Sequence, residues 1–107
     1  MQGTDMNQLL QGETYEYPFK DADESLKLDV WAKGVGMPHL DPAVWRWDRC
    51  GRIMRYSDHG NTDSNYGWEI DHIYPRAKGG ASTIDNLQPL NWQTNREKGN
   101  FFPFRCR

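Results

Sequence analysis

Long apolar runs are missing from this sequence of 107 residues. No stretch approaches the ~20 apolar residues that a membrane-spanning helix requires, and the first residues lack the charged-then-apolar pattern of a secretory leader. We therefore expect a cytoplasmic protein that has no membrane partner.

Cysteine is also scarce. The two cysteines, Cys50 and Cys106, lie 56 positions apart, and neither belongs to a Cys-x-x-Cys pair. This spacing argues against a cysteine-rich structural zinc site. Because no secretion signal is evident, two free, partly buried thiols are the expectation, and a disulfide is the alternative.

The excess of positive charge that is common in nucleic-acid-binding proteins is absent, since the net charge is −2. The average conceals a split between residues 1–30, which carry −5, and residues 31–107, which carry +3. Such asymmetry is typical of a polyanion-binding surface with an acidic tail. An ordinary mixed-charge surface explains the charge equally well.

Aromatic residues are plentiful, with five Trp, five Tyr and four Phe, and they supply large side chains for a thin core. We interpret residues 1–20 as an acidic, loosely ordered arm and residues 21–107 as one α+β domain. Within the domain, the segment "SLKLDVWAKG" offers Ser25 and Gly34 as the start and stop of a helix, although its alternating apolar residues also fit a strand. Residues 44–61 predict a hairpin that turns near Cys50.

The second half of the domain has the more informative pattern. The stretch "WEIDHIYP" predicts a strand that Pro75 ends. A loop with a double glycine follows, and residues 84–90 predict a second extended segment. The stretch "NWQTNREKG" predicts a short helix, with Asn91 as its N-cap and Gly99 as its stop.

Each of these three elements carries a polar residue of interest. Asp71 and His72 end the first strand, Asn86 follows His72 by fourteen residues, and Asn95 follows Asn86 by nine. With "DHI", "GG", "DNLQPL" and "TNREKGN" in this order, the sequence resembles the HNH endonucleases of the ββα-metal (His-Me finger) fold. The motif core spans residues 68–100. Because Asn95 stands where the family often has His, the chain resembles an HNN variant of the small stand-alone bacterial or phage type.

The resemblance implies a ββα motif, and the predicted N-terminal helix and extra hairpin would elaborate it. It also implies a divalent-metal-dependent DNA endonuclease or nickase. His72 would be the general base, since an imidazole titrates near ~6.5. Asp71 and Asn95 would hold one metal ion, and Asn86 would hold the His72 loop in place. Carboxylate and amide oxygens suit Mg²⁺ or Mn²⁺, although Zn²⁺, Ni²⁺ or Co²⁺ can replace them in crystals.

Double-stranded DNA is the expected partner. The basic residues that are candidates for phosphate contacts are Arg76, Lys78, Arg96, Lys98, Arg52 and Arg55. Lys98 is equally well interpreted as a charge that complements the helix dipole. DNA specificity would come from residues 1–60 or from a protein partner. Two alternatives remain: a catalytically weak DNA-binding module, and a nuclease toxin that needs a cognate inhibitor.

Overall fold

The computed structural model describes residues 13–107 and has an α+β fold. Its helices are η1 (Phe19–Asp21), α2 (Glu24–Trp31), η2 (Tyr56–Asp58), η3 (Arg76–Lys78), η4 (Ile84–Asn86) and α3 (Trp92–Lys98), of which the η elements are single 3₁₀ turns. Its strands are β1 (Val35–Gly36), β2 (Trp45–Trp47), β3 (Ile53–Arg55), β4 (Trp68–His72) and β5 (Leu87–Asn91). Neither α2 nor α3 has the length and apolarity that crossing a bilayer requires.

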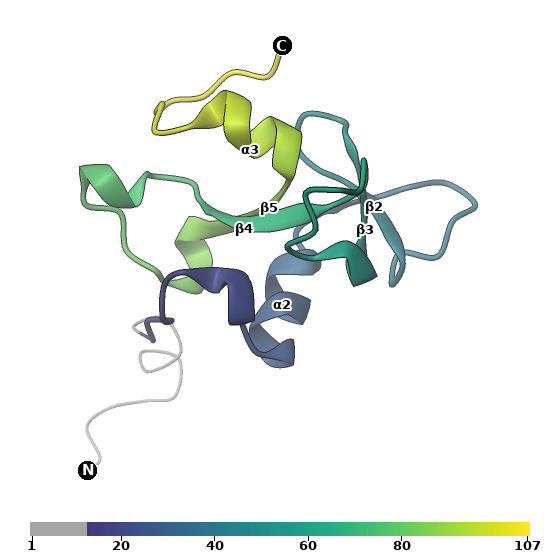
Figure 1. Ribbon diagram of the computed structural model, residues 1–107, viewed down its shortest axis with the longest axis horizontal. Helices are drawn as coiled ribbons and strands as arrows, with labels where there is room; N and C mark the ends of the chain where they lie inside the picture. The colour runs from purple at the N-terminus through teal and green to yellow at the C-terminus, as the bar shows by residue number, and fades with distance from the viewer. Residues whose placement is uncertain (1–12) are drawn as a thin grey trace.

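The strands form two small antiparallel sheets. One has the order β1-β2-β3, and the other is the β4–β5 hairpin, in which Asp71 pairs with Gln88 and His72 with Leu87. α3 lies on one side of this hairpin and α2 on the other (Figure 1). Between them, β4, β5 and α3 form the predicted ββα unit.

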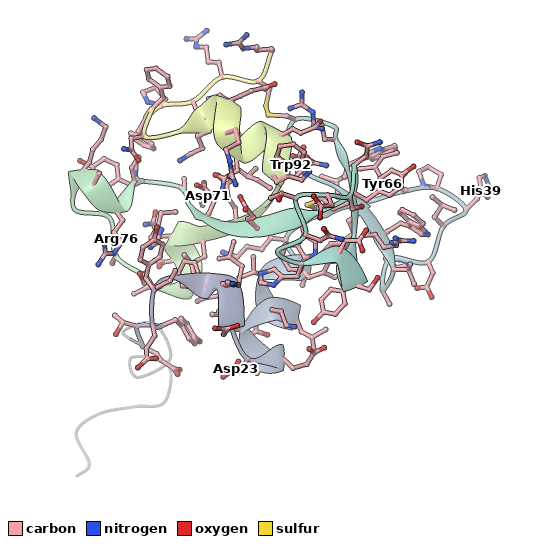
Figure 2. The ribbon with its side chains drawn as sticks, viewed as in Figure 1. Asp23, His39, Tyr66, Asp71, Arg76 and Trp92 are labelled. Carbon is pink, nitrogen blue, oxygen red and sulfur yellow. A yellow bond between two sulfur atoms is a disulfide. The ribbon has the colours of Figure 1, made fainter. Side chains whose placement is uncertain are left out.

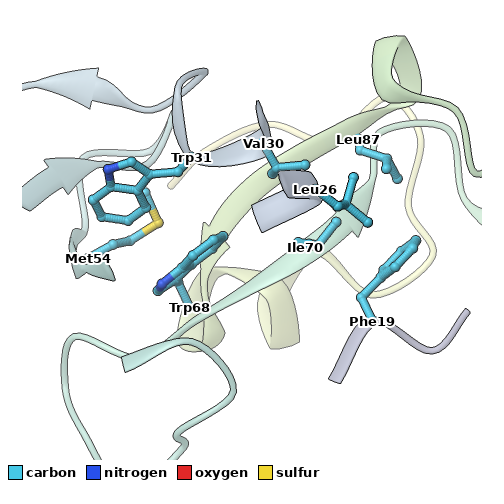
Figure 3. Packing of buried hydrophobic residues seen from close by; sticks show 8 residues of the cluster. All are labelled: Phe19, Leu26, Val30, Trp31, Met54, Trp68, Ile70 and Leu87. Atoms are coloured by element: carbon cyan, nitrogen blue, oxygen red, sulfur yellow. The ribbon is translucent and has the colours of Figure 1, made fainter. Parts of the chain in front are cut away.

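Alternation along β4 decides which side chains reach which helix. Trp68 and Ile70 join the buried core cluster, together with Leu87 of β5 and with Leu26, Val30 and Trp31 of α2 (Figure 3). Successive residues of a strand point to opposite faces. Glu69 and Asp71 therefore point toward α3, where their side chains contact Asn95, Arg96 and Lys98.

α3 begins and ends where the sequence predicts. The Asn91 side chain accepts a hydrogen bond from Gln93 N at 2.8 Å, and Gly99 follows the last helical residue with a positive φ of 51°. Asn91 is 1% exposed, and its Nδ2 donates to the carbonyls of Ile53 and Asn65. The start of α3 is thus fixed to β3 and to the loop that precedes β4.

α2 confirms the predicted helix but not its expected cap. Asp23, and not Ser25, is the N-cap, since its carboxylate accepts a hydrogen bond from Leu26 N at 2.9 Å. The helix ends at Trp31, before Gly34. Asp and Ser are comparable N-cap residues, and burial of Leu26 and Val30 places the first turn two residues earlier than expected.

The boundary of the predicted arm at residue 20 falls inside the packed part of the chain. Residues 1–12 lie outside the described residues. Within residues 13–20, Phe19 is 5% exposed and belongs to the core, and Tyr15 N donates to Ser82 O at 2.9 Å. Aromatic side chains fix this acidic segment to the domain, and its charge pattern does not reveal them as anchors.

The expectation of two free thiols is wrong, because Cys50 and Cys106 form a disulfide with a Cα–Cα distance of 5.2 Å. The bond joins the β2–β3 turn to the tail that follows α3. The tail also packs against the turn through Arg49, whose guanidinium lies 5.6 Å from the centre of the Phe104 ring. This pairing depends on how the tail folds back, which the spacing of two cysteines does not encode.

Candidate active site

Three of the predicted site residues line one cavity. Asp71, His72 and Asn95 border a cavity of about 300 Å³ beside β4. β4 pairs with β5 alone among the described strands, and its other edge carries no strand, only the bridge between His59 and Trp68 at its start. Asp71 and His72 leave the strand on opposite faces, but β4 ends at His72. Both side chains can therefore reach the same cavity around the end of the strand, although they are adjacent in the sequence.

Asp71 is held by two neighbours. Its Oδ2 accepts a hydrogen bond from Gln88 Nε2 at 3.0 Å, and the Lys98 ammonium lies 3.2 Å from the same oxygen and 3.5 Å from Oδ1. The residue is 9% exposed. Burial raises the pKa of the Asp71 carboxyl, and the contacts with Gln88 and Lys98 oppose that rise.

His72 lies beneath the N-terminal segment. The residue is 6% exposed, and the rings of Tyr17 and Phe19 are centred 5.5 and 5.2 Å from its own ring. Burial lowers the pKa of His72, and the positive charges of Arg76 and Lys98 lower it further. The imidazole is therefore predominantly neutral at pH 7, which is the form that accepts a proton.

Ser82 is the polar partner of His72, with Nε2 and the Ser82 Oγ 2.8 Å apart. Either atom can donate, since the roles depend on the tautomer of the ring. The contact restrains the ring at Nε2 and does not engage Nδ1.

Asn86 lies outside this cavity and closes the loop that follows His72. Its Oδ1 accepts from Tyr74 N at 2.9 Å, and its Nδ2 donates to Tyr74 O at 3.1 Å and to Ala81 O at 2.8 Å. A Cβ at Gly80 would lie 1.8 Å from Tyr74 O, so the second glycine of the pair lets the loop close. This placement is compatible with the holding role expected for Asn86.

Asn95 reaches the cavity from α3, and its Nδ2 donates to Glu69 Oε1 at 2.7 Å. Lys98, three residues later on the same helix, is 2% exposed and also donates to the His72 carbonyl at 2.9 Å. Lys98 therefore points into the site. A lysine that contacts DNA phosphates from the surface would point toward solvent instead.

The other predicted DNA-binding residues fall into two groups. Arg76 and Arg96 border the cavity, and Lys78 is exposed in the same 3₁₀ turn as Arg76, within the loop that joins β4 to β5 (Figure 2). Arg52 and Arg55 do not border it: Arg52 pairs with Glu97 at 2.8 Å, and Arg55 pairs with Asp58 at 3.1 Å. These two arginines cross-link elements of the fold.

The sequence pattern did not point to four residues that shape the site: Tyr17, Glu69, Ser82 and Gln88. Strand alternation could have indicated Glu69, which lies two residues before Asp71 on the same face. Gln88 requires the register of the hairpin, and Tyr17 and Ser82 require tertiary packing.

The oxygen donors of the site suit a hard divalent ion. Within residues 13–107, no group of three or more His, Cys, Asp and Glu side chains is placed to hold a metal. The candidate set is instead the Asp71 carboxylate and the Asn95 amide. Among residues 13–107, the one polar contact of Asp71 Oδ1 is the long one of 3.5 Å with Lys98, so this oxygen can accept an ion while Oδ2 stays bonded to Gln88. Such a set leaves further coordination positions for water and a phosphate oxygen, as Mg²⁺ requires.

Comparison with known protein families assigns this architecture. The model of the HNH endonuclease family matches residues 48–101, half of the chain, and this protein belongs to that family. HNH proteins are nucleases that hydrolyse phosphodiester bonds in DNA, generally with a divalent metal ion. No curated protein and no solved structure matches the chain.

Proposed function

We propose that this protein is a divalent-metal-dependent DNA endonuclease that nicks one strand at a time, with His72 as general base and with Asp71 and Asn95 as metal ligands. The observation that carries the proposal is the convergence of these three side chains, from β4 and α3, on one cavity beside a two-stranded sheet. A single cavity of this kind acts on one phosphodiester at a time.

The chain's own groups divide the work of hydrolysis. His72, neutral and oriented by Ser82, takes a proton from the attacking water. Asn86 keeps the loop after His72 closed, so that the imidazole stays at the end of β4. Asp71 and Asn95 would hold Mg²⁺ or Mn²⁺, which supplies positive charge for the phosphate and the leaving oxygen.

The charges around the cavity favour a polyanionic substrate. Arg76 and Arg96 border it and Lys78 is exposed nearby, so a DNA backbone at the β4 edge would meet basic groups on two sides. Phosphate contacts of this type position a duplex but do not read its sequence. We therefore assign double-stranded DNA as the substrate, with any sequence specificity supplied by a protein partner or by the N-terminal half.

The test is cleavage of supercoiled plasmid with Mg²⁺, with Mn²⁺ and with chelator. The wild-type protein should convert the plasmid to open circles only in the presence of metal. His72→Ala should lower the rate roughly 10²–10⁴-fold, because the base is lost, while binding of a DNA duplex, measured by fluorescence anisotropy, stays nearly unchanged. Asp71→Ala should abolish the metal-dependent rate.

His39→Ala is the matched control, since His39 lies on an exposed loop far from Asp71 (Figure 2). It should cleave at the wild-type rate. A wild-type protein that binds the duplex but leaves the plasmid intact in every metal would instead be a DNA-binding module, and the nuclease assignment would fall.

A further inference from the structure

Glu69 is the one carboxylate that contacts Asn95 among the described residues. It precedes Asp71 by two positions on β4 and points to the same side of the hairpin. Its Oε1 accepts from Asn95 Nδ2 at 2.7 Å and from Arg96 Nη1 at 2.8 Å, while Oε2 accepts from Arg96 Nη2 at 3.3 Å. The carboxylate is thus engaged by two consecutive residues of α3.

This contact fixes the orientation of the Asn95 amide. The oxygen and nitrogen of an asparagine amide are nearly indistinguishable by shape, and only the partner decides which faces it. An ionised carboxylate can only accept hydrogen bonds. The amide nitrogen must therefore face Glu69, and Oδ1, the only amide atom that ligates a hard cation, must point away from it.

The same contacts make Glu69 a poor ligand itself. Arg96 holds it through two hydrogen bonds, and Arg96 is in turn the more exposed partner, with a side-chain exposure of 57% against 23% for Glu69. A carboxylate held in this way is kept from turning toward the cavity. It can act on the cation only through its charge and through Asn95.

From this arrangement we infer that Glu69 is a positioning residue, which orients the Asn95 amide so that its oxygen faces the metal-binding position. The inference rests on the proposed function, in which Asn95 is a metal ligand. The motif alone does not say whether the Asn95 amide can rotate on α3. Here a residue of β4 holds the amide in one orientation.

The experiment measures Mn²⁺ binding to the full chain by calorimetry, together with the melting temperature of each variant. Glu69→Leu removes the acceptor at similar size. Glu69→Gln removes the charge but keeps a carbonyl oxygen that can accept from Asn95. We expect Glu69→Leu to weaken Mn²⁺ binding about tenfold, as loss of a partner that orients a ligand typically does, and Glu69→Gln to weaken it clearly less.

A double variant tests whether the effect passes through Asn95. In the Asn95→Ala background, Glu69→Leu should change Mn²⁺ affinity little, because the amide that Glu69 orients is gone. A purely structural tether between β4 and α3 would lower the melting temperature in both backgrounds and leave the Mn²⁺ affinity of Glu69→Leu unchanged. If Glu69→Leu fails to fold, Glu69→Val, whose β-branched side chain suits a strand, replaces it.

Three results would overturn the inference: wild-type Mn²⁺ affinity in Glu69→Leu, equal losses in the Leu and Gln variants, or an undiminished loss in the Asn95→Ala background. The second result would mean that Glu69 acts by charge alone. A wild-type chain that binds no Mn²⁺ would refute the metal assignment of the proposed function itself, so the two failures are distinguishable.

Discussion

The pair of Asp71 and Lys98 is the most deeply buried ion pair among the described residues, with side-chain exposures of 10% and 3%. A buried ion pair loses hydration on both partners, and removing one partner leaves the other charge uncompensated. The pair therefore adds little net stability but makes each partner dependent on the other. The same pairing holds the ammonium against the carboxylate that we assign to the metal.

Lys98→Met should lower the free energy of unfolding by about 3–5 kcal/mol, because it leaves Asp71 charged and buried without its partner. Adding Asp71→Asn removes the orphaned charge, so the double variant should be more stable than Lys98→Met alone. Urea denaturation of both variants at pH 7 measures the difference.

Lys78→Met is the control for loss of a lysine in general, since Lys78 is exposed and should change stability by less than about 0.5 kcal/mol. Equal stability of the single and double variants would show that Asp71 and Lys98 are not coupled.

The sequence indicated the residues of the site better than their partners. Asp71, His72, Asn86 and Asn95 stand out because their chemistry and order are visible along the chain. Their contacts with Glu69, Gln88, Ser82 and Tyr17 depend on strand register and on folding of the N-terminal segment. Lys98 could be placed on the helix face of Asn95, but its burial follows from the packing of α3 on β4.

At the scale of elements, the loop between β3 and β4 is closed over the start of β4. His59 forms a β-bridge with Trp68, and the two rings are centred 4.7 Å apart. Gly60 N also donates to Trp68 O at 2.9 Å. Burial lowers the pKa of His59, Lys27 lowers it further, and Glu69 opposes the shift.

This shift predicts a pH dependence of stability. A histidine whose pKa is lower in the folded state binds fewer protons there than in the unfolded chain. Its contribution to stability is therefore present above the unfolded value of 6.5 and is lost as pH falls through the folded value. The free energy of unfolding should decrease from pH 7 toward about pH 5, because a half-buried neutral histidine must then be charged.

His59→Asn should reduce this slope, and denaturant titrations at several pH values measure it. The slope should not vanish, because the pKa of His72 is lowered as well. A slope identical to that of the wild type would show that protonation of His59 does not weaken the loop closure.

Element boundaries were predictable where local chemistry sets them. α3 has its cap and its glycine in the sequence, and the β2–β3 hairpin turns near Cys50 as expected. The predicted N-cap of α2 was wrong because two suitable residues, Asp23 and Ser25, lie close together. β1 could not be predicted in this way, because its two residues are extended only through pairing with β2.

At the scale of the molecule, one covalent bond encloses most of the region that matches the HNH family. The disulfide joins residues 56 positions apart, and the region between them contains β3, β4, β5 and α3. The family match begins at residue 48 and ends at residue 101, so the cross-link nearly brackets it. On the tail side, Cys106 lies beyond a run of aromatic residues, of which Phe102 packs edge-on against Tyr74 at 5.0 Å between centroids.

The expectation of free thiols rested on the expectation of a cytoplasmic protein. The disulfide between Cys50 and Cys106 is not what that reasoning predicts. Disulfides persist in oxidising surroundings and are rare where thiols are kept reduced. The family motif does not decide the redox state of two cysteines at its margins. Only the folded tail, which returns to the β2–β3 turn, brings Cys50 and Cys106 together.

Replacing both cysteines with serine should lower the free energy of unfolding by about 2–4 kcal/mol, because a cross-link across a long loop restricts the unfolded chain. Denaturant titrations under oxidising conditions measure the loss. Adding reductant should bring the wild type to the stability of the double-serine variant and should leave that variant unchanged, which controls for other effects of the reductant.

Metal-dependent cleavage should survive at temperatures where the variant stays folded, since neither cysteine borders the cavity of Asp71, His72 and Asn95. Equal stability of oxidised and reduced wild-type protein would show that the disulfide adds no stability beyond that of the tail packing.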